Sequence, residues 1–400
     1  MGVGSRGTSL LKTLLSMEGI EVNALGDINP DHLARARSIV EKERGKSPEG
    51  YSAGLEDFRR LVVRDDLDAV IAATPFEWHT PVSVAAMKAG KYAASEVPAA
   101  VTVEECWELV NTSEQTGMPC MMLENVCYFR DMLMILNTVR SGLFGELIHC
   151  GGGYQHDSRA GLFDDKGEYS YTGYQQWYTF YIERRNGNLY PTHPIGPIAQ
   201  CLNIDRGDRF THLVSMSSKM LGPNLWVKEK FGPQHKNAQK SFALGDINTT
   251  MIRTQNGATI TLYYDTQAPR PYDLGFRIQG TKGIYMMLNN SIYIEGKSPH
   301  EKWGSLENYR ERYEHPLWKK LGEAAQSHGH GGADYLTLHQ FIKAVRNRSQ
   351  PDQDVYDAAS WSVISPLSEM SVARGSSPID FPDFTRGKWK TRKPLGIVSE

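Results

Sequence analysis

Apolar runs of strand length alternate with helical stretches over the first third of the chain. The clearest strand candidate runs from Leu67 to Ala73 and is bounded by Pro75, as expected for a buried parallel strand. Thr102 and Glu105 have the spacing of a capping box at the start of a helix at 102–116. The other predicted strands are 22–27, 92–96 and 121–124, and the other predicted helices are 30–43 and 79–89. This alternation predicts a parallel, doubly wound α/β sheet of the Rossmann type.

The pattern changes after about residue 126, where strands with alternating polar and apolar positions dominate. Short links such as Gln255-Asn256-Gly257 are typical of hairpin turns. We expect strands at 146–156, 212–217, 247–254, 259–265, 274–280 and 291–295, and helices at 129–140, 334–346 and 356–373. The sequence therefore predicts two domains, an α/β Rossmann dinucleotide-binding domain at 1–125 and an α+β domain at 126–400 with a large, mostly antiparallel open sheet.

Composition narrows the classes of function. The net charge of −2 gives no electrostatic reason to expect nucleic acid or an acidic membrane as a partner. No apolar run approaches the roughly 18 residues that a membrane span needs. The five cysteines are odd in number and form no C-x-x-C pair, which favours buried free thiols over a zinc or redox site. His328 and His330 lack a third ligand at supporting spacing, so we expect no metal.

A dinucleotide site is predicted at the start of the chain. Gly2, Gly4 and Gly7 form G-x-G-x-x-G, whose glycines allow a tight turn and a close approach of the backbone to a pyrophosphate at a helix N-terminus. The motif alone is weak, and a glycine-rich turn that binds nothing is the alternative. Asp27 strengthens it, because an acid 20 residues after Gly7, at the end of the next strand, binds the adenine ribose hydroxyls and favours NAD over NADP.

The first strand of a Rossmann fold lies immediately before this motif, and its loss would expose two neighbouring strand edges. Because the printed sequence begins at Met1, we expect the true start to lie upstream. The sequence contains no export signal, but an upstream segment would be the place for one, so the location of the protein stays open.

The motifs resemble those of the glucose–fructose oxidoreductase/inositol dehydrogenase superfamily, on the strength of the glycine motif, Asp27 and the stretches 74–79 and 95–98. Simple dehydrogenases of that superfamily carry a lysine where this chain has Val97, which cannot transfer a proton. Longer blocks are similar to glycoside hydrolase family 109, the NAD-dependent α-N-acetylgalactosaminidases; they lie at 124–128, 152–157, 185–187, 189–193, 270–272, 329–332, 383–385 and 387–389.

This resemblance implies a set of site residues. NAD would contact the glycine motif and Ser5, Arg6, Asp27, Phe76, Glu77, Trp78, His79, Glu96, Val97 and Asn125. The sugar or glycan substrate would contact Tyr154, Tyr178, Tyr190, Pro191, Thr192, His193 and Tyr272. Tyr178 departs from the family, which often has arginine there, and this change puts the identity of the sugar in doubt. The resemblance also implies a homo-oligomer that pairs through the second-domain sheet.

The implied chemistry is a redox-assisted elimination, in which NAD transiently oxidises C3 of the sugar, the C2 proton is removed and the C1 substituent leaves. We expect His193 to act as acid and base because histidine titrates near neutral pH, with Tyr190 as a second catalytic residue. Two other functions remain open. Net oxidation of a sugar by NAD would give His193 the lysine's role, and a non-catalytic NAD or sugar sensor would not need His193.

Overall fold

The computed structural model describes residues 1–170 and 175–395, which form two compact units. The first unit comprises Met1–Leu133 and His315–Ser362, and the second comprises Met134–Glu314 and Val363–Pro394. The first unit thus takes in a late segment that the sequence-based boundary at residue 125 assigns to the second domain. Its helices belong there because they pack on elements of the first 133 residues.

Five short parallel strands form the sheet of the first unit, in two groups. The strands are β1 (Ala24–Gly26), β2 (Glu49–Tyr51), β3 (Ala69–Ala72), β4 (Tyr92–Ser95) and β5 (Cys120–Met122). β1 pairs with β2, and β3, β4 and β5 pair in that order. The helices that connect them are α1 (Ser5–Leu15), α2 (Pro30–Arg44), α3 (Phe58–Val62), α4 (His79–Lys88) and α5 (Val103–Thr116). The predicted α/β Rossmann fold is confirmed, as is the capping box at Thr102 and Glu105.

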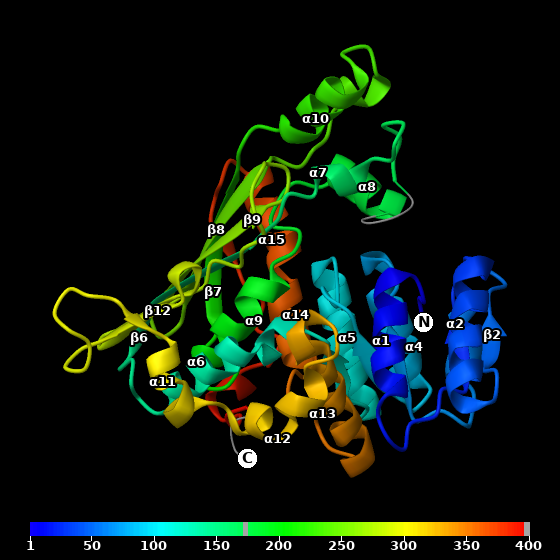
Figure 1. Cartoon of the computed structure of the whole chain (residues 1–400), viewed down its shortest axis with the longest axis horizontal. Coiled ribbons are helices and arrows are strands. Elements are labelled where there is room, and N and C mark those ends of the chain that lie inside the picture. Colours follow the sequence, from blue (N-terminus) through cyan, green and yellow to red (C-terminus); the bar gives the residue numbers. More distant parts are fainter. Residues whose placement is uncertain (171–174, 396–400) are drawn as a thin grey trace. The chain divides into compact units, whose positions relative to one another are not determined.

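Later helices complete this unit: α12 (Pro316–Ala325), α13 (Ala333–Asn347) and α14 (Val355–Ser362). α13 packs against α1, and α14 packs against α5 and β5 (Figure 1). The prediction of one helix at 356–373 is wrong, because α14 ends at Ser362 and α15 (Ile364–Ala373) follows as a separate helix. Pro366 explains the break, since its ring lacks an N–H and clashes with the carbonyl four residues earlier, that of Ser362.

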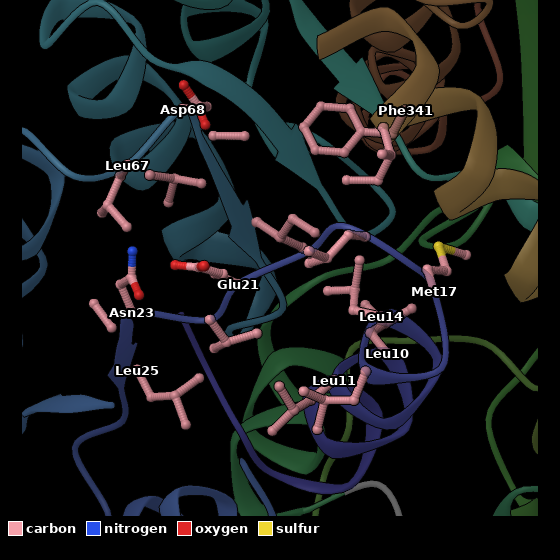
Figure 2. Close-up of a pocket in the computed structure, with 18 of the residues that line it drawn as sticks. Leu10, Leu11, Leu14, Met17, Glu21, Asn23, Leu25, Leu67, Asp68 and Phe341 are labelled. Carbon is pink, nitrogen blue, oxygen red and sulfur yellow. The ribbon is translucent and has the colours of Figure 1, made fainter. Parts of the chain in front are cut away.

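A cavity of about 900 Å³ lies between β1 and β3 in the first unit (Figure 2). Leu10, Leu11 and Leu14 of α1 line it, together with Leu25 of β1 and Phe341 of α13. The two groups of strands therefore do not form a continuous sheet at this point.

The second unit contains a nine-stranded sheet in the order β13-β12-β11-β10-β6-β9-β8-β7-β14. These strands are β6 (Leu147–Gln155), β7 (Phe210–Ser217), β8 (Ile247–Thr254), β9 (Thr259–Asp265), β10 (Arg277–Gly280), β11 (Gly283–Met286), β12 (Ser291–Ile294), β13 (Gly304–Ser305) and β14 (Ile379–Asp380). Every neighbouring pair is antiparallel except β6 and β9. The predicted large, mostly antiparallel sheet is confirmed.

Helices of the second unit pack against this sheet or connect its strands. They are α6 (Arg130–Arg140, which begins in the first unit), α7 (Arg159–Leu162), α8 (Gln175–Arg184), α9 (Thr192–Cys201), α10 (Gly222–Phe231) and α11 (Glu307–Tyr313). α9 packs on β6, and α15 packs on β7 (Figure 1). No helix within residues 1–170 and 175–395 is long and apolar enough to cross a bilayer. All five cysteines are buried free thiols, as predicted.

Candidate functional site

The glycine motif forms a tight turn at the start of α1. Gly2 has φ +74°, and a Cβ there would lie 2.4 Å from the carbonyl oxygen of Ala73. A Cβ on Gly7 would lie only 1.8 Å from the carbonyl oxygen of Gly2. Gly4 caps α1 without a side-chain hydrogen bond, and Ser5 begins the helix, so the first-turn amides are available to an anion.

Asp27 lies next to this turn, directly after β1. Its Oδ2 accepts a hydrogen bond from the amide of Val3 at 2.8 Å, and its Oδ1 accepts one from the amide of Asn29 at 2.8 Å. The carboxylate is therefore fixed between the glycine turn and the start of α2. This is the position that a carboxylate needs in order to bind the adenine ribose of a dinucleotide.

A network of charged side chains surrounds Arg6 in the first turn of α1, and its two acids, Glu96 and Asp334, are buried. Its Nε donates to Oε1 of Glu96 at 2.7 Å, and its Nη1 and Nη2 donate to Oδ2 and Oδ1 of Asp334 at 2.6 and 3.0 Å. Asp334, in the first turn of α13, also accepts from Nδ2 of Asn125 at 2.7 Å and lies 2.9 Å from Nδ1 of His330. The network joins three predicted cofactor residues to an acid that sequence reasoning did not identify.

The charges in this network stabilise one another. Burial by itself raises the pKa of Asp334, but hydrogen bonds from His330 and Arg6 outweigh it and hold that pKa well below its ordinary value. Burial likewise opposes the charge of Arg6, while Glu96 and Asp334 raise its pKa above the ordinary value. Both side chains are therefore ionised throughout the neutral range.

Three buried polar atoms lie at the carboxyl ends of the central strands without a hydrogen-bond partner among the described residues. They are Oγ1 of Thr74 after β3, Oγ of Ser95 at the end of β4, and Oδ1 of Asn125 after β5. Ligands of open α/β sheets bind at this edge. The atoms, together with the glycine turn and Asp27, fit a polar cofactor such as NAD, which would supply the missing hydrogen bonds.

The stretch from Phe76 to His79 has a structural role in this unit. His79 is 1% exposed, with Nδ1 2.6 Å from the carbonyl oxygen of Pro98 and Nε2 2.8 Å from that of Thr74. It links the turns that follow β3 and β4, and its burial lowers its pKa. Phe76 packs edge-on against His79, Glu77 is exposed, Trp78 packs on Phe58, and Val97 is buried.

The second unit brings together most of the residues predicted for the sugar. Tyr154 of β6 lies 4.7 Å from Tyr190 and 5.6 Å from His193, measured between ring centroids, and Tyr190 lies 4.8 Å from His193. Tyr272, which is 50% exposed, lies 6.4 Å from Tyr154 and 5.5 Å from His156. We call these five residues the aromatic cluster. His156 is the one member that the sequence analysis did not predict, although it lies in the block 152–157 together with Tyr154.

Close packing of α9 on β6 creates this cluster. A Cβ on Gly152 would lie 3.0 Å from Cβ of Pro194, so the glycine lets the first turn of α9 approach the strand. Pro191 caps α9, and Thr192 begins it with a buried Oγ1 that has no hydrogen-bond partner within the described residues. Tyr190 and His193 thereby flank the α9 N-terminus beside Tyr154.

Tyr178 lies behind the cluster rather than in it. It is 3% exposed, and its hydroxyl hydrogen-bonds to the hydroxyl of Tyr264, whose ring stacks 6.4 Å from that of Tyr154. Arg270 donates to Gln155 at 2.7 Å and to Asp265 at 2.6 Å at the ends of β6 and β9. In the described part of the chain, no group of three or more His, Cys, Asp or Glu side chains is arranged to hold a metal ion.

Models of known families match both parts of the chain. Residues 1–124 match the model of the oxidoreductase family with an NAD-binding Rossmann fold, and residues 128–391 match that of the C-terminal domain of glycosyl hydrolase 109. The chain belongs to glycosyl hydrolase family 109. The cofactor of this family 109 protein is NAD, and the resemblance seen in its sequence is confirmed.

Two curated relatives extend the match over almost the whole chain. One is named alpha-N-acetylgalactosaminidase, from Tannerella forsythia, and is 46% identical over 98% of this chain and 87% of its own length. The other is a glycosyl hydrolase family 109 protein from a Shewanella species, 46% identical over 100% of this chain and 87% of its own length.

Solved structures share the fold at low sequence identity. A levoglucosan dehydrogenase in complex with NADH and levoglucosan is 20% identical, with a TM-score of 0.68 over 96% of this chain and 98% of that one. An NAD binding oxidoreductase from Klebsiella pneumoniae is 14% identical, with a TM-score of 0.72 over 96% of this chain and 97% of that one.

Proposed function

We propose that this family 109 protein is an NAD-dependent glycosidase that cleaves α-N-acetylgalactosaminides or related glycosides without net oxidation. The observation that carries the proposal is the aromatic cluster, which places a histidine and two tyrosines around one point in the second unit. The name of the Tannerella forsythia relative supports the substrate class. Val97 supports a route other than simple dehydrogenation, because its side chain cannot transfer a proton.

When bound, NAD supplies reversible hydride chemistry at C3 of the sugar, which makes the proton on C2 acidic. His193 takes that C2 proton as general base, since it is the histidine that lies beside both Tyr154 and Tyr190. The bond between C1 and the glycosidic oxygen then breaks, and the leaving oxygen is protonated as it departs. Water then adds at C1 and the proton returns to C2. Because the hydride taken from C3 would also go back to the ring, the free sugar forms without net oxidation.

The other cluster residues bind and orient the sugar. Tyr190, whose ring lies 4.8 Å from His193, donates a hydrogen bond to the oxygen on which negative charge develops. Tyr154 and Tyr272 offer ring faces and hydroxyls to the sugar. Tyr178 acts through Tyr264, because its buried hydroxyl is bonded there.

A test of this function measures release of the aryl group from an aryl α-N-acetylgalactosaminide with and without added NAD. We expect release to require NAD and to proceed without accumulation of NADH. His193→Ala should lower turnover by about 10²–10⁴-fold, the range for loss of a general base. His212→Ala is the matched control, because His212 lies on β7 in the same unit and outside the cluster. Equal activity of both variants would remove His193 from the mechanism.

We also propose that two copies pair through the open face of the nine-stranded sheet. Three large apolar side chains are exposed on adjacent strands of this face: Met216 (63%), Met251 (56%) and Tyr263 (40%). Met251→Glu should convert the oligomer to monomer in analytical ultracentrifugation. Leu288→Glu, at a 73% exposed position outside the sheet, should leave the mass unchanged. A wild-type mass for Met251→Glu would contradict the pairing.

A further inference from the structure

A cavity of about 520 Å³ lies in the second unit, beside α8. α7 packs on α8 and on α10, and α10 packs on the short helix η3 (Lys236–Ala238) (Figure 1). The lining comes from the turn 164–169, from α8 and from the stretch 236–240. Ligand sites commonly have volumes of about 300–1,000 Å³, so this space can hold a small organic ligand.

Two aromatic rings form the apolar part of the lining. The ring centroids of Tyr169 and Phe180 lie 5.3 Å apart, with an angle of 81° between the ring planes. Tyr169 is buried, and Nζ of Lys240 lies over its ring, 4.6 Å from the centroid. Phe180 is 37% exposed and is therefore the aromatic surface that the cavity offers to a ligand.

The charged side chains of the lining already have partners, and their charges cancel. Two lysines and two acids line the cavity. Nζ of Lys236 lies 2.6 Å from Oε2 of Glu168, and Nζ of Lys240 forms an ion pair with Glu183. Oδ1 of Asp164 accepts a hydrogen bond from the amide of Glu168 at 2.9 Å. A charged ligand would have to compete with these ion pairs, whereas hydroxyl groups can add hydrogen bonds to the remaining lone pairs and N–H groups.

Contacts behind the lining hold these groups in place. The ring of Phe163 stacks on that of Trp226 at 5.7 Å and lies 6.1 Å from that of Tyr169, measured between centroids. Nδ2 of the buried Asn237 donates to the carbonyl oxygen of Gly167 at 2.7 Å, which joins the stretch 236–240 to the turn. Because these groups are fixed before binding, little free energy is lost in ordering them around a ligand.

α8 separates the cavity from the aromatic cluster. Tyr178 hydrogen-bonds to Tyr264, whose ring stacks on that of Tyr154, whereas Phe180 lines the cavity. Residues two positions apart on an α-helix are roughly 200° apart around its axis, so Tyr178 and Phe180 lie on opposite faces of α8. The cavity is therefore a site distinct from the cluster.

We propose that this cavity binds a neutral pyranose residue of a glycan, with one face of the sugar on Phe180 and its hydroxyls on Glu168 and Lys236. Aromatic rings pack on the C–H faces of sugars, carboxylates accept hydrogen bonds from hydroxyls, and ammonium groups donate to them. With one ring and a few exposed polar groups as contacts, we expect a Kd of about 1 mM for a single sugar. This binding needs neither NAD nor turnover, so it goes beyond the glycosidase function and does not depend on it.

The test places 4-fluorophenylalanine at the position of Phe180 in the full chain and follows its fluorine NMR signal. The protein is titrated with galactose, N-acetylgalactosamine and N-acetylglucosamine, and we expect a saturable shift with at least one of them. Glu168→Ala should weaken that binding by about tenfold, the effect of losing one hydrogen bond to a charged group. Glu229→Ala is the matched control, because Glu229 is an exposed glutamate of α10 outside the lining, and it should leave the Kd unchanged.

Three results would overturn the proposal. The first is no shift with any of the three sugars at concentrations far above the expected Kd. The second is a shift that Glu168→Ala leaves unchanged, since its source would then be a sugar in the aromatic cluster. The third is much tighter binding of galacturonate than of galactose, because the cavity would then select anions. If Glu168→Ala alters the fold, Lys236→Ala replaces it with the same expected weakening, since the Lys236 side chain is 70% exposed. A failed glycosidase assay does not affect this readout.

Discussion

Asp334→Asn tests whether the charge network around Arg6 holds the cofactor turn in place. The aspartate oxygens receive two hydrogen bonds from Arg6 and one from Asn125, and His330 lies within hydrogen-bond distance. An asparagine has the same shape but replaces one acceptor oxygen with an NH2 group. That group faces donors, so Arg6 loses at least one partner and the charge that balances it.

The expected loss of stability follows from how deeply the Arg6–Asp334 ion pair is buried. Removing one partner of a buried ion pair costs about 3–5 kcal/mol. The Asp334 side chain is 0% exposed, but the Arg6 side chain is 28% exposed and keeps Glu96, so we expect a value near the lower limit. A loss of about 3 kcal/mol lowers the melting temperature of a domain of this size by about 6–12 °C. NAD affinity should fall as well, because Arg6, Glu96 and Asn125 lose their fixed positions.

The pH dependence gives a second signature of the same network. The pKa of Asp334 is depressed in the folded protein, so its contribution to stability is present above the pKa of an unfolded aspartate, about 3.9, and is lost as the pH falls below it. In acid, the stability of Asp334→Asn should therefore decrease less than that of the wild type. From about pH 5 upward Asp334 and Arg6 are both fully ionised, so the stability difference between the wild type and Asp334→Asn should not change with pH.

Calorimetric melting and a fluorescence titration with NAD measure both effects. Asp31→Asn is the matched control, since Asp31 also lies in the first turn of a helix but is exposed. We expect the control to change stability by less than about 1 kcal/mol. A melting temperature for Asp334→Asn equal to that of Asp31→Asn would refute the argument that the network stabilises the turn.

Three further predictions concern single features. Burial depresses the pKa of His79, so as the pH falls the unfolded chain binds a proton before the folded protein does. The free energy of unfolding should therefore decrease as the pH drops below about 6.5, the pKa of an unfolded histidine. In melting experiments at several pH values, His79→Gln should make this decrease smaller. Burial raises the pKa of Cys120 and of Cys201 to about 12, so a thiol reagent at neutral pH should label them only after unfolding; rapid labelling of the native protein would contradict their burial. Gly152→Val should displace α9 and lower glycosidase turnover at least tenfold while leaving NAD affinity unchanged, because it clashes with Pro194 in the second unit.

Local patterns were sufficient to predict most of the fold. The strands at 247–254 and 259–265 have the predicted limits, since alternation of polar and apolar residues and the Gln255-Asn256-Gly257 turn define them without tertiary context. The glycine motif and Asp27 also lie together as predicted. For these strands and for the glycine turn, a short stretch of sequence contains enough information to predict the structure.

Other elements depend on contacts that no short pattern contains. α9 was not predicted because Pro194, Gly196 and Pro197 are poor helix residues, and packing on β6 stabilises the helix despite them. The contact between Arg6 and Asp334 spans 328 residues, so no spacing rule indicates it. The parallel pairing of β6 with β9 is equally non-local, although each strand was predicted by itself.

The most direct test of the account is hydrolysis of an aryl α-N-acetylgalactosaminide in D2O with NAD, followed by mass spectrometry of the sugar. Removal and return of the C2 proton should give free sugar with deuterium at C2 and no net NADH. Oxidised, uncleaved glycoside with accumulating NADH would contradict the elimination mechanism and make the protein a sugar dehydrogenase.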